Sequence, residues 1–287
     1  MCSPNVAQTV RERIAREGVP QVSRRNFLRM GGLTAGGVAV ASMLGPNKLN
    51  RMAIARAQEA TEVIDLSHVF SVNVPTYLLG EGPTRETFVT VEQDGFYIQK
   101  WNFGEHAGTH VDIPAHFVAD GTTVDNYDAV NLVSPAVVID ISAKAAEVAD
   151  ATLDVADIEA WESANGEIPA GAVVFLYSGW DAKWNEPEAF RNADADGVQH
   201  YPGFSPEAAS FLVEQRDIHG IGVDTLSLDI GASTTFDVHV TVLGAGKFGI
   251  EGVANLAAIK ERQATVIVGV PRWEEGSGGP ARILALA

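Results

Sequence analysis

Residues 106–117 read HAGTHVDIPAHF and carry three of the seven histidines of this 287-residue chain, together with one carboxylate. His106, His110, Asp112 and His116 all occupy even-numbered positions, so in an extended chain their side chains point to the same side. The intervening positions are mostly apolar and supply the opposite face. The pattern predicts a strand-and-turn site with one buried face and one face that presents imidazole and carboxylate groups.

A helical arrangement of this stretch is disfavoured. On a helix the four polar side chains would scatter around the axis, and Gly108 and Pro114 both weaken a helix. Four extended residues span roughly 13 Å, so His106 and His110 reach one metal ion only if the chain bends between them. We expect this bend at Gly108. Two imidazoles and a carboxylate are common ligands for a divalent cation that keeps one position open for water.

The composition limits which side chains can bind a metal and which partners and cofactors are expected. Cys2 is the only cysteine, so a metal has to be held by histidine and carboxylate side chains. The chain has 20 Lys and Arg against 37 Asp and Glu, a formal net charge of −17. We expect no nucleic-acid partner, because a polyanion would meet a repulsive field. Gly244 and Gly246 lack the third glycine of a dinucleotide-binding loop, so no nucleotide cofactor is expected.

Residues 1–57 are typical of an export signal rather than of a folded domain. Arg24 and Arg25 precede an uncharged stretch over 30–47 that is rich in glycine and alanine. The segment ends in a small-residue Ala-Arg-Ala sequence, the expected cleavage site. This order resembles a twin-arginine signal and predicts export through that machinery to the periplasm or the exterior. The alternatives are an N-terminal amphipathic helix and an uncleaved membrane anchor.

The remaining residues, 58–287, are predicted to form one α/β domain that carries 11 basic and 35 acidic residues, a net charge of −24. Helical patterns predict helices over 152–161, 205–215 and 252–262, and paired runs near 85–103 predict an antiparallel hairpin. Strands that alternate with helices, together with this hairpin, indicate a mixed sheet. Short apolar, β-branched runs predict five buried strands, at Val63–Leu66, Val137–Ile141, Val173–Tyr177, Ile218–Val223 and Thr265–Val270.

The stretch His106–Phe117 resembles the His-x-Gly-Thr-His-x-Asp-x-Pro-x-His signature of the cyclase-like metal-dependent hydrolases, a family that includes bacterial kynurenine formamidase and isatin hydrolase. The resemblance implies a mixed α/β domain around a β-barrel-like core, of the swivelling β/β/α type, that commonly forms a homodimer. It extends over almost the whole predicted domain, through Asp65–His68, Phe175–Trp180, Tyr201–Ser205, Gly220–Thr225 and Gly276–Arg282.

The resemblance also implies a role for each site residue. His116 is the proton-transfer residue rather than a ligand, and Asp112 bridges if two ions are bound. The implied cofactor is zinc, with manganese as the alternative, and one or two ions per site. The implied metal ligands are His106, His110 and Asp112, with His239 and Glu251, twelve positions apart as in the family pattern, at a second metal position.

These groups favour hydrolysis of an amide carbon–nitrogen bond. A divalent cation activates water and polarises a carbonyl, and His116 can take a proton from the attacking water and return it to the leaving nitrogen. We expect a small-molecule amide or lactam substrate. An aryl formamide such as N-formylkynurenine is the favoured class, which would make the protein an arylformamidase-like enzyme, and a cyclic amide is the other. Two alternatives remain: a metal-dependent cyclase or lyase, and a non-catalytic periplasmic metal- or ligand-binding protein.

Several other residues have two interpretations on sequence alone. Arg282 is a candidate either for binding a substrate carboxylate or for a surface ion pair. His200 and His219 are expected to be structural. Four aromatic residues are candidates for pocket walls, although most are expected in the core: Phe103, Phe117, Trp180 and Tyr201.

Overall fold

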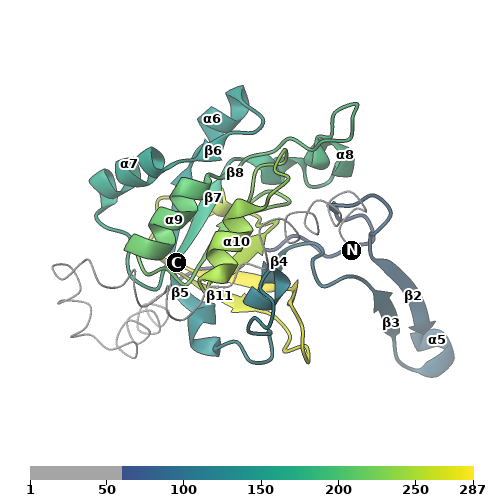
Figure 1. Ribbon diagram of the computed structural model, residues 1–287. Coiled ribbons are helices and arrows are strands. Elements are labelled where there is room, and N and C mark those ends of the chain that lie inside the picture. Colours follow the sequence, from purple (N-terminus) through teal and green to yellow (C-terminus); the bar gives the residue numbers. More distant parts are fainter. Residues whose placement is uncertain (1–59) are drawn as a thin grey trace.

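The computed structural model describes residues 60–287, which form a single α/β domain (Figure 1). The predicted export signal, residues 1–57, lies outside the described residues. A nine-stranded sheet forms the centre of the domain, in the order β1-β13-β11-β5-β7-β9-β10-β4-β12. Its strands are β1 (Val63–Asp65), β4 (His110–Asp112), β5 (Val133–Asp140), β7 (Val173–Tyr177), β9 (Gly220–Val223), β10 (Phe248–Glu251), β11 (Ala264–Gly269), β12 (Gly278–Pro280) and β13 (Arg282–Leu286).

The sheet is mixed, as predicted. Strands β5, β7, β9 and β10 run parallel to one another in the middle of the sheet. On one side β11, β13 and β1 follow in antiparallel pairs, and on the other side β4 pairs antiparallel with β10 and β12 antiparallel with β4. All five predicted strand segments are present, with shifts of a few residues at their ends.

The sheet is curled into a half-barrel. Strand β12 lies at one edge of the strand order and β13 lies next to the other edge, yet only Ala281 separates them in the chain. The two edges must therefore approach each other. An isolated antiparallel bridge between Ser67, just after β1, and Val253, just after β10, also joins distant parts of the sheet. This curl agrees with the expected barrel-like core.

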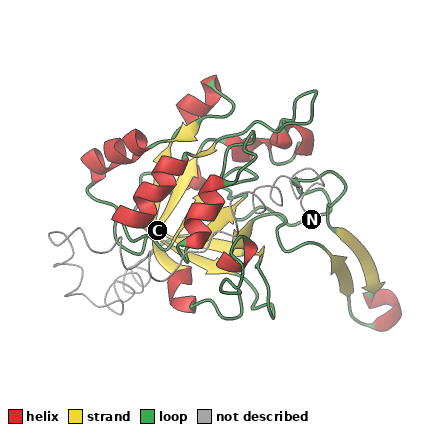
Figure 2. Ribbon diagram, in the orientation of Figure 1, coloured by secondary structure: helices red, strands yellow, loops and turns green. Residues whose placement is uncertain are grey.

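Helices cover one face of the sheet (Figures 1 and 2). The longest are α7 (Val155–Asn165), α9 (Pro206–Gln215) and α10 (Asp237–Gly244). Within residues 60–287, no helix combines the length and the apolar character that crossing a bilayer requires. The shorter helical segments are α5 (Val91–Asp94), α6 (Ser142–Glu147), α8 (Pro187–Arg191) and the 3₁₀ turns η1 (Pro114–His116), η2 (Ala129–Leu132), η3 (Trp180–Lys183) and η4 (Leu256–Ala258).

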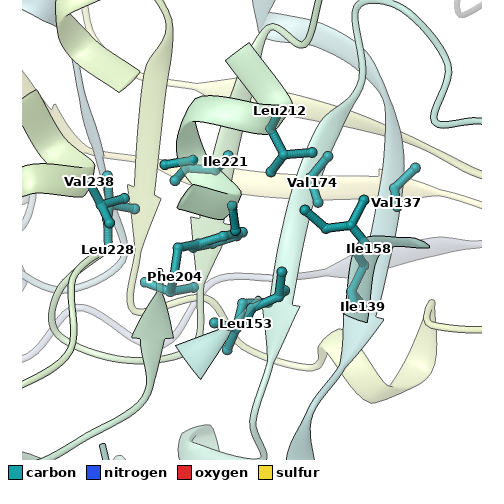
Figure 3. Close-up of a cluster of buried hydrophobic side chains, with 14 of the residues drawn as sticks. Val137, Ile139, Leu153, Ile158, Val174, Phe204, Leu212, Ile221, Leu228 and Val238 are labelled. Carbon is teal, nitrogen blue, oxygen red and sulfur yellow. The ribbon is translucent and has the colours of Figure 1, made fainter. Parts of the chain in front are cut away.

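Two apolar clusters hold the sheet in place, one on each face. Figure 3 shows the cluster beneath the helices, where Ile158 of α7, Leu212 of α9 and Val238 of α10 pack on the sheet. Strand β7 is buried on both faces, because Val174 belongs to this cluster and Phe175 belongs to the other. A fully buried strand of this kind is typical of a parallel sheet that is covered on both sides.

Two small sheets lie outside the main one. Strands β6 (Thr152–Leu153) and β8 (Gly203–Phe204) pair in parallel. Strands β2 (Thr84–Val89) and β3 (Ile98–Asn102) form the antiparallel hairpin that the sequence predicts, with α5 at its tip. Among residues 60–287 these two strands pair with each other alone, and the hairpin extends away from the body of the domain (Figure 1).

The structure corrects two of the three helix predictions. The helix over 205–215 is confirmed, with Ser205 as its N-cap. The helix predicted over 152–161 begins later, at Val155, because Asp154 forms a capping box with Asp157. The helix predicted over 252–262 is wrong: left-handed φ values at positions 252 and 255 interrupt it, and only the turn η4 forms.

Candidate metal centre

Strand β4 presents His110 and Asp112 on one face and buries Val111 on the other, as the alternation of the sequence predicts. All three residues are buried. His106 reaches the same point because the chain bends at Gly108, which has a φ of +71°. A side chain at that position would also lie 2.8 Å from the ring of Phe70. The predicted bend is confirmed, and glycine is required there for both its conformation and its size.

The first donor group consists of His106, His110 and Asp112. One carboxylate oxygen of Asp112, Oδ1, lies 2.7 Å from His106 Nδ1 and 3.3 Å from His110 Nε2. The three atoms therefore lie close together, and all belong to the 106–112 segment. The sequence prediction that these residues come together is confirmed.

The second donor group shares Asp112 and adds His239 and Glu251. His239 Nε2 lies 3.5 Å from Asp112 Oδ2 and 3.0 Å from Glu251 Oε1. Glu251 ends strand β10 and pairs in register with His110, which brings its Oε2 to 3.3 Å from His110 Nε2. The two predicted outlying residues therefore join the motif, and Asp112 lies between the two groups.

The other nitrogen of each histidine has its own acceptor. His110 Nδ1 lies 2.9 Å from the carbonyl oxygen of Gly108. His239 Nδ1 lies 2.6 Å from Asp229 Oδ2. His106 Nε2 lies 2.9 Å from Ser277 Oγ. When these nitrogens carry the protons, the opposite nitrogens direct their lone pairs toward Asp112 and Glu251, which is the arrangement found around metal-binding histidines.

The site also fits a cation by its charge. Asp112 Oδ2 is buried and has no hydrogen-bond partner among residues 60–287. Burial alone would lower the pKa of His110, but Asp112 and Glu251 reverse this effect and raise its pKa to about 10. The two carboxylates therefore draw protons onto the neighbouring imidazoles. A divalent cation would balance the charge of Asp112 and Glu251 and would give Asp112 Oδ2 a partner.

His116 lies beside the cluster but belongs to neither donor group of the described residues. It ends the turn η1, and its ring stacks on the ring of His106, with centroids 3.6 Å apart and planes 18° from parallel. Burial lowers the pKa of His116 to about 3, so the ring is neutral at pH 7. A neutral imidazole next to a metal position can accept a proton.

Of the predicted aromatic wall, Phe117 lies at the site and stacks on His239, with ring centroids 4.7 Å apart. Trp180 and Tyr201 belong instead to a buried aromatic cluster, and Phe103 is exposed and packs against Phe70. Phe236, which no sequence pattern marks, has its ring centroid 5.7 Å from that of Phe117. Aromatic residues therefore cover the side of the cluster that carries His239.

Three other candidates lie outside the cluster. Arg282 forms an ion pair with Asp65, 2.7 Å between Nη2 and Oδ2, which selects the surface interpretation. His219 binds Ser134, with 2.8 Å between Nδ1 and Oγ, and is structural as expected. His200 likewise binds carboxylates of surface loops rather than those of the cluster.

Sequence reasoning missed the residues that hold the ligands. Asp229 accepts hydrogen bonds from His239 Nδ1–H and from the backbone N–H groups of Val238 and His239. The same carboxylate therefore caps the N-terminus of α10 and orients the ring of His239. Glu105 and Ser277 hold His106. Glu105 is adjacent to the motif and Asp229 lies ten residues before His239, whereas Ser277 is 171 residues from His106. No local pattern marks Asp229 or Ser277.

Residues 64–230 match the sequence model of the Cyclase family, described as "Putative cyclase". The chain belongs to the Cyclase family. The curated relatives include an isatin hydrolase of Roseibium aggregatum, 33% identical over 243 residues, which cover 78% of this chain and 91% of that protein. A kynurenine formamidase of Bacillus cytotoxicus is 27% identical over 232 residues, covering 79% and 98%.

A solved structure supports the same assignment for the fold. An isatin hydrolase bound to the product analogue thioisatinate is 30% identical and superposes with a TM-score of 0.76, covering 85% of this Cyclase-family chain and 98% of that protein. The curled mixed sheet is therefore the family's fold. The predicted family and fold class are both confirmed.

Proposed function

We propose that this protein is a metal-dependent hydrolase that cleaves an amide carbon–nitrogen bond in a small molecule. The observation that carries this proposal is the pair of donor groups joined by Asp112, found in a chain that resembles isatin hydrolase over most of its length. The donor atoms are imidazole nitrogens and carboxylate oxygens, which suit zinc and also accept manganese. Two groups with one shared carboxylate provide for one or two ions.

The side chains then have separate tasks. When bound, a divalent cation acts as a Lewis acid and lowers the pKa of water toward neutrality. His116, stacked on His106, takes the proton of the attacking water and returns it to the leaving nitrogen. Phe117 and Phe236 exclude water from the side of the cluster where His239 lies. Glu251 and Asp112 supply the negative charge that balances the cation.

A cyclic amide is the favoured substrate class. The similarity to isatin hydrolases reaches 33% in sequence and a TM-score of 0.76 in structure, whereas the kynurenine formamidase is 27% identical. An aryl formamide such as N-formylkynurenine is therefore the second substrate to test. Both substrates present a carbonyl that a Lewis acid polarises and a nitrogen that His116 can protonate.

A substrate panel tests this function. Purified protein with zinc or manganese is given isatin, N-formylkynurenine, a simple lactam and a simple lactone, with the His110→Ala variant as the control. We expect hydrolysis of an amide by the wild type and its loss in the variant, which lacks one ligand of the first donor group. Metal binding without hydrolysis of any amide would contradict the proposal and favour a lyase or a binding protein.

We further propose that residues 1–57 direct export by the twin-arginine route to the periplasm or exterior. The support is the Arg24-Arg25 pair and the apolar stretch that follows it. Replacement of both arginines by lysine should leave the protein in the cytoplasm. Unchanged export would reject this proposal.

The expected homodimer is supported by the hairpin of β2, α5 and β3. A two-stranded hairpin is marginal on its own, and this one exposes Phe88 (53%), Phe96 (54%) and Tyr97 (55%). Exposed apolar patches on extended elements are typical of protein interfaces. Light scattering after gel filtration should give the mass of two chains. A mass of one chain would contradict the dimer.

A further inference from the structure

The Gly-Ser-Gly-Gly run at 276–279 lies directly against His106 of the first donor group. A Cβ atom added at Gly278 would lie 2.8 Å from His106 Cε1 and would overlap the carbonyl oxygen of Val111. One added at Gly276 would lie 2.8 Å from Glu105 Oε1. Side chains at either glycine would therefore push Glu105 and His106 away. The run forms a cradle for these two residues.

The serine inside this cradle joins a carboxylate to a ligand histidine. Ser277 Oγ lies 2.6 Å from Glu105 Oε2 and 2.9 Å from His106 Nε2. A carboxylate accepts hydrogen bonds, so the hydroxyl donates to Glu105 and its lone pair accepts the proton on His106 Nε2. The proton is thus held on Nε2. Nδ1, which lies 2.7 Å from Asp112 Oδ1, is then left to offer its lone pair to a cation that Asp112 would also bind.

We propose that Ser277 and Glu105 are positioning residues that fix the ring of His106 for metal binding. The inference rests on the metal site of the proposed function and adds the residues that orient it. Because His116 stacks on His106, the same hydrogen bonds also set the plane on which the proton-transfer residue lies. Ser277 and Glu105 touch neither the cation nor the substrate in this scheme.

The hydroxyl of Ser277 is not needed to hold the loop. Backbone groups anchor it: Ile113 N–H donates to Ser277 O at 2.9 Å, Val124 N–H donates to Gly276 O at 2.8 Å, and Ser277 N–H donates to Glu105 Oε2 at 3.1 Å. Strand β12 continues this attachment by pairing with β4. Removal of the Ser277 hydroxyl should therefore leave the loop in place and affect the orientation of His106.

The test is zinc affinity, measured on the full chain after chelation, by competition with a chromophoric chelator. Ser277→Ala should bind zinc about 10- to 100-fold more weakly, the usual cost of losing a partner behind a metal ligand. Glu105→Ala should weaken binding in the same direction. Ser277 and Glu105 act through one series of hydrogen bonds to His106. The double variant should therefore lose no more zinc affinity than the single variant that binds zinc more weakly.

Two further variants separate positioning from folding. Ser134→Ala removes a serine–histidine hydrogen bond of similar length, the 2.8 Å contact with His219, and should leave zinc affinity unchanged. Glu105→Gln should retain most of the affinity, because one oxygen of Glu105 accepts both bonds from Ser277. Thermal melting without metal shows which variants are folded. If Ser277→Ala is unfolded, the two Glu105 variants carry the test, since Glu105 is only half-buried.

Wild-type affinity in Ser277→Ala, additive losses in the double variant, or equal losses in Glu105→Gln and Glu105→Ala would each overturn the inference. These outcomes are independent of the proposed hydrolysis. If the wild type binds zinc but cleaves no amide, the proposed function fails and the positioning role is still measured. If amides are cleaved and the variants bind zinc normally, the function stands and the positioning role fails.

Discussion

Asp229→Asn is a sharp perturbation of the second donor group. The Asp229 carboxylate is nearly fully buried and accepts three hydrogen bonds: 2.9 Å from Val238 N, 3.2 Å from His239 N and 2.6 Å from His239 Nδ1. Asparagine keeps one acceptor oxygen and replaces the other with an NH₂ group. In either orientation of the amide, this NH₂ group faces at least one backbone N–H that it cannot satisfy.

The expected losses follow from these contacts. If the NH₂ group faces His239, it favours the tautomer with the proton on Nε2, the atom that faces Asp112 and Glu251, and metal binding must then overcome the wrong tautomer. We expect metal affinity to fall about 10- to 100-fold, equivalent to about 1.4 to 2.7 kcal/mol. One unsatisfied buried donor should lower the free energy of unfolding by about 1–3 kcal/mol.

The assay is a zinc titration with elemental analysis, alongside urea unfolding of the metal-free protein. Asp224→Asn is the matched control. That carboxylate is also buried and also accepts hydrogen bonds from three donors, Ser178 N, Ser178 Oγ and Trp180 N, but it is not part of either donor group. It should lower stability and leave zinc affinity intact. Equal zinc affinity in the wild type and in Asp229→Asn would refute the reasoning.

Three other predictions are testable with the same protein. His116→Ala should keep its metal, because His116 is in neither donor group of the described residues, and should lower turnover by roughly 100-fold or more; loss of metal would make it a ligand. Gly278→Ala should weaken zinc binding by displacing the ring of His106, and normal binding would contradict the close approach. Burial lowers the pKa of His68 to about 4, whereas the unfolded chain takes up a proton near pH 6.5, so stability should be lost as the pH falls from 6.5 to 4. Because the ring is partly exposed, the expected loss in the free energy of unfolding is on the order of 2 kcal/mol. It is measured by urea unfolding of the wild type and of His68→Phe at pH 7 and pH 4.5. The same pH dependence in both proteins would contradict the prediction.

Local patterns predict the centre of the site well. Alternation places His110 and Asp112 on one face of β4, and Gly108 has the positive φ of the bend that brings His106 to them. The central β-branched runs of β5 and β7 correspond to strands because they are buried on both faces of a covered sheet. Ser205 and the proline after it mark the start of α9 through capping, which is a local interaction.

Elements set by distant contacts escape such patterns. Helix α10 carries His239 within Val-His-Val-Thr-Val, a β-branched sequence with low helix propensity. It begins because Asp229, in the loop that leads from β9 into the helix, accepts hydrogen bonds from the N–H groups of Val238 and His239. The helix predicted over 252–262 fails for a related reason: the N–H groups at 252 and 253 bond to carbonyls at the end of β9 and just beyond it. Tertiary contacts override local propensity in both segments.

The most direct test of the central claim is elemental analysis of the purified protein, coupled to amide hydrolysis before and after chelation. We predict stoichiometric zinc or manganese, hydrolysis of isatin or N-formylkynurenine that a chelator abolishes, and recovery when the metal is restored. Hydrolysis that survives complete removal of metal would contradict the account. So would a purified protein that binds no metal at the two donor groups that share Asp112.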